Sequence, residues 1–315
     1  MSFIYTADWH IKTKFREVPI SWLSDRFLEW LVFLENERKR LNTDTLVIGG
    51  DLFDKIPTMF DMALFATIDY ATNFNEIMIY PGNHEMLSKK NSFYTYLEKI
   101  FPQFTWITEP QQWRDWWVIP YPDIKQVGPL NKEKVMSHVR CASDRGLYDA
   151  EIDFSIFDNC DAVLLGDIHE HRVISDKIKY PGAPYDTTFT RLPLRNRYYF
   201  YVDGDSVLVC KRAGNSFKRL IKVDTTIEHY NNVRDKVKNS KHYYDIQIIV
   251  DSMDELDSMK GQDMVKVKLR ETDDTYEDAD TIEEEMYNYL VQVLGMDNSA
   301  ATQVMTVYKE LSNAD

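Results

Sequence analysis

The sequence lacks the features that mark a secreted, membrane-spanning or disordered protein. Its three cysteines, Cys141, Cys160 and Cys210, are scattered and have no metal-binding or redox spacing, which is typical of a reducing cytoplasm. No run approaches the roughly 18 consecutive apolar residues of a membrane span, and no basic region precedes an apolar one at the start, as in a secretory signal. With 44% hydrophobic residues among 315, the chain can bury a sizeable core. We therefore expect a folded cytoplasmic protein without a membrane partner.

Basic residues are outnumbered, and the excess acidic charge lies near one end. The formal net charge is −14, which is unusual for a protein that binds nucleic acid. Residues 271–315 hold 12 acidic residues and a single basic one, Lys309, so this segment carries −11 and leaves −3 for residues 1–270. The body of the chain is therefore near neutral and can carry a basic groove.

The order of apolar segments predicts a large α/β domain followed by two smaller parts. Between residues 2 and 201, short apolar runs alternate with helical patterns, and from about residue 180 the runs read as strands without intervening helices. This asymmetry predicts two sheets packed face to face with helices outside, over residues 1–223. Residues 224–270 read as a small α+β unit, and residues 271–315 as an acidic linker followed by a helix pair.

Potential metal ligands follow five of the predicted strands. In α/β sheets, side chains from several strands converge at the carboxyl ends of the strands. Carboxylate, amide and imidazole donors suit Mn, Fe or Zn better than Ca. The residues after these strands are Asp8, His10, Asp51, Asn83, His84, His138, Asp167 and His169.

The motifs differ in how often chance would produce them. A chain of this composition should contain an Asp-x-His such as Asp8–His10 about 0.7 times, but a Gly-Asn-His such as Gly82–His84 only roughly 0.01 times. A single Asp or His at a strand end is usually a hydrogen-bonded loop residue. The ordered set therefore favours a metal centre over coincidence.

The ordered set resembles the calcineurin-like metallophosphoesterases. Their pattern D-x-H, G-D-x-x-D, G-N-H-[DE], H and G-H-x-H occurs here as Asp8–His10, Gly50–Asp54, Gly82–Glu85, His138 and Gly166–His169. The chain is most similar to the SbcD/Mre-eleven recombination nucleases, and among these to the members from T-even bacteriophages. This narrower resemblance rests on residues 50–54, on residues 180–184 and on the acidic linker with its helix pair. It implies a four-layer α/β/β/α sandwich with residues 224–270 as a capping, DNA-binding domain.

The resemblance also implies two divalent cations, with Mn as the first choice and Mg as the alternative. One cation would be held by Asp8, His10, Asp51 and His169, and the other by Asp51, Asn83, His138 and Asp167. Two cations roughly 3.5–4 Å apart clamp a phosphodiester and activate water for in-line attack. His84 would protonate the leaving oxygen or stabilise its charge, and Glu85 would orient His84.

Two positions leave alternatives open. The family usually has histidine where this chain has Asp167, and an aspartate there makes the site more anionic and favours Mn; in the rival register, His169 and His171 form the H-x-H pair. Asp54 stands where cellular Mre-eleven nucleases have histidine. It either supports catalysis or caps the helix that begins soon after Pro57.

Several basic residues near the motifs are candidates for contacts with DNA phosphates, although such residues can equally form a solvated surface. They are Lys12, Lys14, Arg16, Lys89, Lys90, Arg191, Arg195 and Arg197. The tryptophans at 106, 113, 116 and 117 are expected to pack in the core and not to stack on bases.

The leading hypothesis is a metal-dependent DNA nuclease of recombination, repair and replication, acting as an exonuclease on duplex ends and an endonuclease on single strands. The resemblance implies an SbcC-like coiled-coil ATPase as partner, docked through residues 281–312. It also implies a homodimer formed through helices near 59–72 and 92–100, and a location in the host bacterial cytoplasm if the chain comes from a phage. A phosphatase acting on phosphoproteins or nucleotides is the alternative, but Lys55 and Met86 stand where protein phosphatases carry arginines. A non-catalytic scaffold is disfavoured because no ligand is missing.

Overall fold

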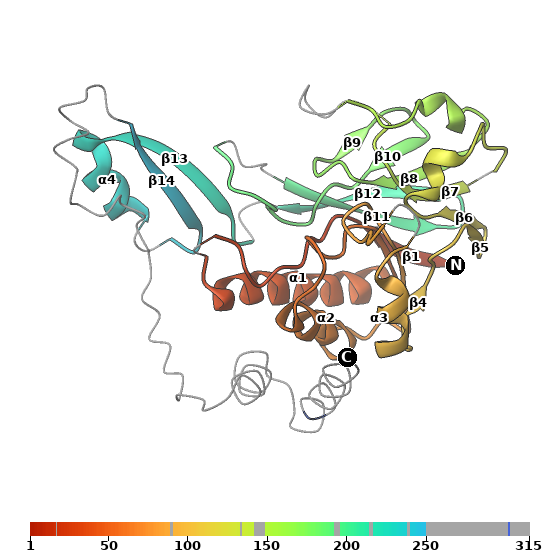
Figure 1. Ribbon diagram of the computed structural model, residues 1–315, viewed down its shortest axis with the longest axis horizontal. Helices are drawn as coiled ribbons and strands as arrows, with labels where there is room; N and C mark the ends of the chain where they lie inside the picture. The colour runs from red at the N-terminus through yellow and green to blue at the C-terminus, as the bar shows by residue number, and fades with distance from the viewer. Residues whose placement is uncertain are drawn as a thin grey trace.

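A computed structural model of the chain is shown in Figure 1. The structure describes residues 1–16, 18–88, 91–132, 134–141, 149–191, 196–213, 217–237 and 240–249, together with residue 302. The predicted linker and helix pair of residues 271–315 lie outside the described residues, apart from Thr302, as does the second half of the predicted capping domain. Within the described ranges, no helix combines the length and the apolar character needed to cross a membrane.

The first of two six-stranded sheets contains the strands that precede Asp8, Asp51 and Asn83. Its order is β12-β11-β1-β2-β3-β4, with the last four strands parallel to one another and β11 and β12 antiparallel. The strands are β1 (Ser2–Thr6), β2 (Thr45–Gly49), β3 (Glu76–Tyr80), β4 (Thr105–Trp106), β11 (Asn196–Asp203) and β12 (Ser206–Ala213).

The second six-stranded sheet contains the strands that precede the remaining predicted ligands. Its order is β5-β6-β7-β8-β10-β9, in which the four central strands are parallel and the two edge strands antiparallel. The strands are β5 (Gln111–Trp113), β6 (Trp116–Ile119), β7 (Lys134–His138), β8 (Ala162–Gly166), β9 (Arg172–Val173) and β10 (Ile178–Tyr180).

The two sheets pack face to face, and each is covered on its outer face, which gives the predicted four layers. Helices cover the first sheet (Figure 1), and two 3-10 helices pack against the outer face of the second. Along β2, Val47 faces the second sheet while Leu46 and Ile48 face the helices. The helices are α1 (Ile20–Leu41), α2 (Met59–Ala71) and α3 (Tyr94–Ile100), and the 3-10 helices are η1 (Asp123–Gln126) and η2 (Phe154–Phe157).

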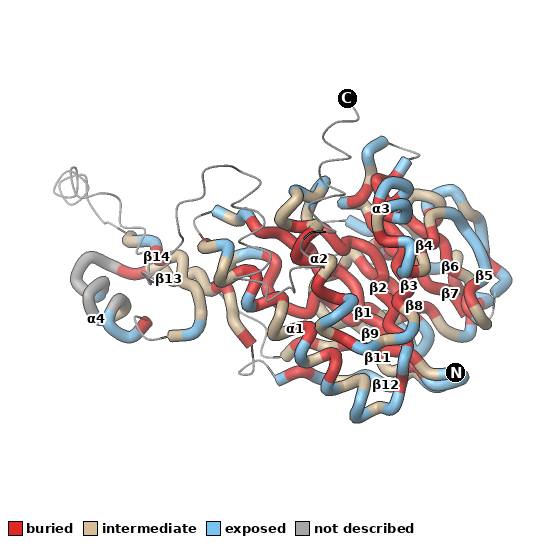
Figure 2. The backbone as a smooth tube through the Cα atoms, turned by 90° about the horizontal axis from the view of Figure 1, so that it is seen from below, coloured by how far each residue is buried: buried red, intermediate tan, exposed pale blue. Residues whose placement is uncertain are grey.

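Burial on both faces explains why the central strands read as continuous apolar runs. Every residue of β2 is buried, and the buried residues form a band through the middle of the molecule in Figure 2. Each fully buried Val, Leu or Phe side chain stabilises the fold by about 1.5–3 kcal/mol relative to an exposed one. Trp106, Trp113 and Trp116 are buried in the same cores and Trp117 packs against one of them, as expected.

Helix α2 begins at a capping box, which resolves one alternative for Asp54. The hydroxyl of Thr58 accepts a hydrogen bond from the backbone N–H of Asp61, and the carboxylate of Asp61 accepts one from the N–H of Thr58. This reciprocal pair satisfies donors that the first helical turn leaves free. Asp54 is not the N-cap, so its interpretation as a helix cap is wrong.

A small unit lies at one end of the molecule, set apart from the two sheets in Figures 1 and 2. It contains the parallel pair β13 (Leu220–Thr226) and β14 (Tyr243–Ile249), connected by α4 (Ile227–Val237). This small sheet therefore includes residues 220–223, which the sequence pattern assigns to the large domain. Arg16 pairs with Asp245 at 2.9 Å across the junction with the large domain.

Candidate metal centre

Five of the predicted ligands lie where four strands of the two sheets end. Asp8 and His10 follow β1, Asp51 follows β2, His138 ends β7, and His169 follows β8. β1 is parallel to β2, and β7 is parallel to β8, so the carboxyl ends of each pair lie at the same edge of their sheet. Apart from the partly buried His169, these residues are at most 1% exposed.

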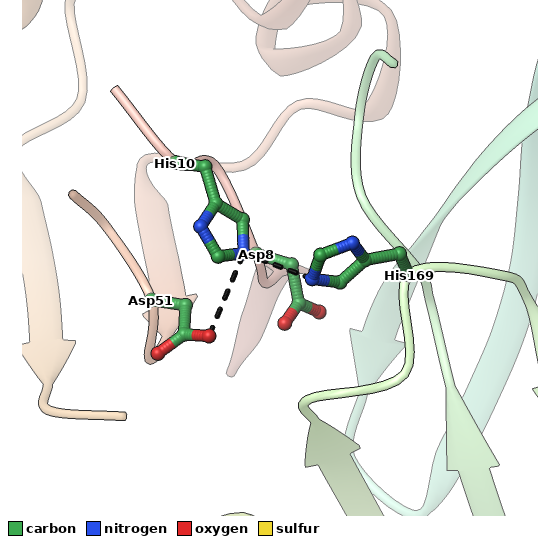
Figure 3. A group of neighbouring side chains, drawn as sticks. All are labelled: Asp8, His10, Asp51 and His169. Carbon is green, nitrogen blue, oxygen red and sulfur yellow. Dashed lines mark hydrogen bonds and ion pairs between the residues drawn. The ribbon is translucent and has the colours of Figure 1, made fainter. Parts of the chain in front are cut away.

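The first cluster consists of Asp8, His10, Asp51 and His169. Each offers one donor atom, and these four atoms all lie within 4.8 Å of one another. Figure 3 shows the four side chains turned toward a common centre. His10 Nε2 lies 2.9 Å from His169 Nε2 and 3.5 Å from a carboxylate oxygen of Asp51. The arrangement brings together the ligands that the resemblance assigned to one cation.

The second cluster shares Asp51 with the first and adds His138 and Asp167, with donor atoms again within 4.8 Å of one another. His138 Nε2 lies 3.3 Å from Asp51 Oδ2. The side-chain amide of Asn83 lies beside them, with its oxygen 3.2 Å from His138 Nε2. Asp51 belongs to both clusters and would therefore contribute to both sites if two cations bind.

The electrostatics of the clusters fit bound cations. Asp8, Asp51 and Asp167 bring three carboxylates into one space, and Asp8 Oδ2 is buried without a hydrogen-bond partner in the described residues. Burial, together with the neighbouring carboxylates of Asp51 and Asp167, raises the pKa of Asp8 well above its usual value, although His138 opposes the rise. Unpartnered buried oxygens and like charges are costly, and divalent cations would offset both costs. The donors present therefore fit two such ions.

Backbone strain is concentrated at the same residues. Asp8, His10, Asp51 and Asp167 have φ angles of 57°, 44°, 49° and 96°, and they are four of the seven non-glycine residues with positive φ in the described part of the chain. The left-handed conformation costs roughly 1–2 kcal/mol for an ordinary residue. Strained residues gather at functional sites because a required side-chain direction outweighs local preference.

The motif glycines leave room for the His138 ring. A Cβ at Gly50 would lie 2.3 Å from His138 Nδ1, and one at Gly166 would lie 2.4 Å from the same atom. A Cβ at Gly82 would lie 2.2 Å from Asp51 Oδ1. Three glycines that are far apart in the sequence are thus required by one buried imidazole and its neighbouring carboxylate.

Glu85 has a different role from the predicted one. Its carboxylate is fully buried and accepts hydrogen bonds from the backbone N–H groups of Asp51, Phe53 and Gly82 at 2.8–3.0 Å. Burial and the nearby Asp51 carboxylate raise the pKa of Glu85 to about 7. The structure shows Glu85 holding two ligand loops together, so the prediction that it orients His84 is wrong.

His84 lies at the open side of the centre, with its side chain 38% exposed. Its Nδ1 donates a hydrogen bond to the backbone carbonyl of Asp54 at 2.6 Å, and its Nε2 lies 3.9 Å from Asp51 Oδ2. Burial lowers the pKa of His84, but the Asp51 carboxylate and the Asp54 carbonyl outweigh this effect and raise it. The ring can therefore present a proton on Nε2.

Lys12 is not available for DNA, contrary to our prediction. Its side chain is 4% exposed, and its ammonium donates to Asp54 Oδ1 and to the carbonyl of Thr187, both at 2.8 Å. The same Asp54 oxygen lies 3.5 Å from His10 Nδ1. Asp54 thus stands behind a predicted ligand and carries the carbonyl that holds His84.

The other basic candidates differ in exposure. Arg197 is buried and paired with Asp186, so its assignment to phosphate contacts is wrong. Arg191 is 61% exposed and pairs with Asp224, while Arg16 pairs with Asp245. Lys14 is exposed. Three further candidates lie outside the described residues: Lys89, Lys90 and Arg195.

His171 lies outside both clusters. Its Nδ1 is 2.7 Å from the carbonyl of Tyr180, and its ring stacks on Tyr198 with 4.4 Å between centroids. Asp167 and His169 occupy the two clusters instead. The structure therefore contradicts the register that pairs His169 with His171.

Two solved structures are similar to part of the chain. The match to the protein TT1561 of Thermus thermophilus spans 66% of this chain and 97% of TT1561. The sequence identity is 15% and the TM-score is 0.38. The second structure is a conserved uncharacterized protein from Streptococcus pneumoniae, described as a predicted phosphoesterase. The match spans 68% of this chain and 90% of that protein, with 14% identity and a TM-score of 0.31.

Sequence comparison identifies a relative and a family. A protein of Escherichia phage T5 named probable exonuclease subunit 1 is 29% identical over 227 residues, which are 66% of this chain and 68% of the relative. The family model for calcineurin-like phosphoesterases matches residues 1–171, more than half of the chain. That range contains both clusters and His84. The chain therefore belongs to the calcineurin-like phosphoesterase family and is a metal-dependent hydrolase.

Proposed function

We propose that this protein is a DNA nuclease that hydrolyses phosphodiester bonds with two divalent cations, Mn in the first place. The observation that carries the proposal is the pair of adjoining clusters that share Asp51, with His84 at their open side. Two cations in such a site polarise the scissile phosphodiester and activate the attacking water. The phage T5 relative is named a probable exonuclease subunit, which supports a nucleic acid as the substrate.

Some side chains of the site would bind the cations, and another would transfer a proton. The first cluster and the second cluster, with Asn83, would hold the two ions. His84 would give the proton on its Nε2 to the leaving oxygen, because its Nδ1 is committed to the Asp54 carbonyl. The same imidazolium would stabilise negative charge that develops on that oxygen.

A diester substrate is favoured over a monoester by two positions near the site. Lys55 and Met86 stand where protein phosphatases of this family carry arginines. A monoester dianion is bound well by bidentate arginine, which neither residue can replace. A phosphodiester carries a single charge and depends less on such contacts.

We also propose an ATPase partner and a homodimer. An SbcC-like ATPase would dock on residues 281–312, which lie outside the described residues apart from Thr302. A homodimer would form through α2 and α3, where Tyr70 and Tyr96 are 47% and 61% exposed. Deletion of residues 281–315 should leave cleavage by the isolated subunit intact and abolish co-purification with the ATPase. Continued co-purification would contradict this docking site.

The decisive experiment compares His84→Gln with the parent protein on labelled DNA in Mn²⁺. We expect unchanged metal content and DNA binding, with cleavage slowed by about 10²–10⁴-fold, the usual contribution of a general acid. His171→Gln, outside both clusters, should bind metal and cleave like the parent. Cleavage by His84→Gln at the parental rate would remove His84 from the mechanism. Faster hydrolysis of p-nitrophenyl phosphate than of its bis-ester would favour a phosphatase instead.

A further inference from the structure

Lys12 lies behind the first cluster and contacts the supports of two of its residues. One of its two hydrogen-bond acceptors is Asp54, and the other is the backbone carbonyl of Thr187. These acceptors are far apart in the chain, and each belongs to a residue that contacts a histidine of the cluster. One buried ammonium therefore joins two otherwise separate segments at the back of the centre.

Each of the two histidines is contacted at its outer nitrogen. Asp54 Oδ1 lies 3.5 Å from His10 Nδ1, and Thr187 Oγ1 lies 3.0 Å from His169 Nδ1. The Nε2 atoms of the two rings face each other inside the cluster at 2.9 Å. The group at the outer nitrogen of a ligating histidine determines its tautomer and its ring orientation. Lys12 is bonded to both of the residues that supply these groups.

Burial of Lys12 has a cost that its position must offset. A buried ammonium loses its hydration and is tolerated only when it is paired and hydrogen-bonded. Lys12 is paired with Asp54, and its ammonium also lies 4.4 Å from the centre of the Phe15 ring. Asp54 in turn holds His84 through its own backbone carbonyl. The orientation of three site histidines therefore depends on residues that Lys12 fixes directly.

We propose that Lys12 is a positioning residue that holds His10 and His169 in the orientation needed to bind a divalent cation, and that also steadies His84 through Asp54. The proposal rests on the proposed function of the site and deepens it. It replaces the expectation that Lys12 contacts DNA phosphates. The two roles differ in what they change: a positioning residue affects cation affinity and kcat, whereas a phosphate contact affects the KM for DNA.

The test is Lys12→Met in the full chain, which keeps an unbranched side chain and removes the donors. We expect Mn²⁺ affinity, measured by isothermal titration calorimetry, to fall by about 10–100-fold, the usual effect of losing a group behind a ligand. We also expect kcat on DNA to fall with KM unchanged. Parental Mn²⁺ affinity, or a raised KM with an unchanged kcat, would overturn the proposal.

Lys134→Met is the matched control. Lys134 is also buried, also pairs with carboxylates and also donates to a backbone carbonyl, that of Gly204, but it begins β7 at the end opposite His138. It should lose thermal stability and keep parental Mn²⁺ affinity. A loss of affinity in this control equal to that of Lys12→Met would show a general effect of destabilisation and would overturn the proposal.

A second variant keeps the proposal testable if Lys12→Met does not fold. Thr187→Val removes the hydroxyl next to His169 and keeps the carbonyl that Lys12 contacts, and it should weaken Mn²⁺ binding in the same direction. Parental affinity in this variant would contradict the proposal. Failure of the parent protein to bind Mn²⁺ or to cleave DNA would instead refute the proposed function, so the two failures are distinguishable.

Discussion

The two ends of the central strands carry their charges in different ways. At the carboxyl ends, Asp8, Asp51 and Asp167 are crowded together with left-handed backbone, and Asp8 Oδ2 has no hydrogen-bond partner within the part of the chain that the structure describes. At the amino ends, Lys134 pairs with two exposed aspartates, and Arg114 pairs with Glu76. One end crowds buried carboxylates, of which Asp167 is paired with Arg140 and Asp51 with His138, and the other holds paired charge near the surface.

This difference shows that the residues of the candidate site lower the stability of the fold at the carboxyl ends of the strands. Crowded like charges and backbone strain lower the stability of a protein unless a ligand offsets them. The apolar layer between the sheets offsets this loss of stability, because its side chains are buried between the two sheets. Substitutions at the two ends test this difference.

The largest effect is expected from Asp8→Asn at the carboxyl ends. Loss of this carboxylate should remove one cation site and slow DNA cleavage by at least about 10³-fold, equivalent to about 4 kcal/mol. The same change should raise the melting temperature of the metal-free protein by about 2 °C, because it removes a repelling buried charge. Differential scanning calorimetry in EDTA and a Mn²⁺ titration measure both. A less stable metal-free variant would contradict the comparison.

Glu85→Gln should have the next largest effect, on stability. Both carboxylate oxygens of Glu85 accept backbone N–H groups, and the amide of glutamine would turn an NH₂ group toward one of those donors. We expect the free energy of unfolding to fall by about 2–3 kcal/mol. Urea denaturation in EDTA measures this change. An unchanged unfolding midpoint would mean that the two loops are held by other contacts.

Arg114→Met tests the amino ends. Arg114 is partly exposed, and its guanidinium donates to Glu76 and to the hydroxyl of Thr45. Ion pairs of this kind contribute about 0.2–1 kcal/mol, so the unfolding midpoint should shift only slightly and Mn²⁺ affinity should not change. A measurable loss of Mn²⁺ affinity would show that the two ends are coupled.

The smallest effect is a pH dependence at an ion pair on helix α1. Glu35 on α1 accepts hydrogen bonds from Arg38 and from the backbone of Asn73. The Arg38 bond holds the pKa of Glu35 below its ordinary value of 4.5, although burial opposes this. A folded-state pKa below the unfolded one gives stability that is present above about pH 4.5 and lost as the pH falls.

Glu35→Gln should therefore melt below the parent at pH 7 by an amount that shrinks toward pH 3. Thermal denaturation followed by circular dichroism at pH 7, 5 and 3 gives the comparison. A difference between the two proteins that stays constant with pH would show that the Glu35 carboxylate contributes through its shape and not through its charge.

Spacing along the chain was sufficient to predict two sheets packed face to face and a group of Asp and His residues that converge at strand ends. Strands buried on both faces read as apolar runs, and a ligand that must follow a strand end is visible next to it, as Asp51 is after β2. Glycines near the motifs could have been interpreted as space for His138, because close approach is what small residues permit.

Local pattern determined the layered α/β fold, the order of the motifs and the residues that converge as Asp8, His10 and Asp51 do. Tertiary packing determines that Lys12 is buried, that Glu85 holds backbone and not His84, and that His171 turns away from the centre. The physical reason is distance along the chain. Lys12 contacts Asp54 and Thr187, which are 42 and 175 residues away in the sequence. The free energy of such contacts depends on how the sheets pack and not on the residues next to Lys12 in the sequence.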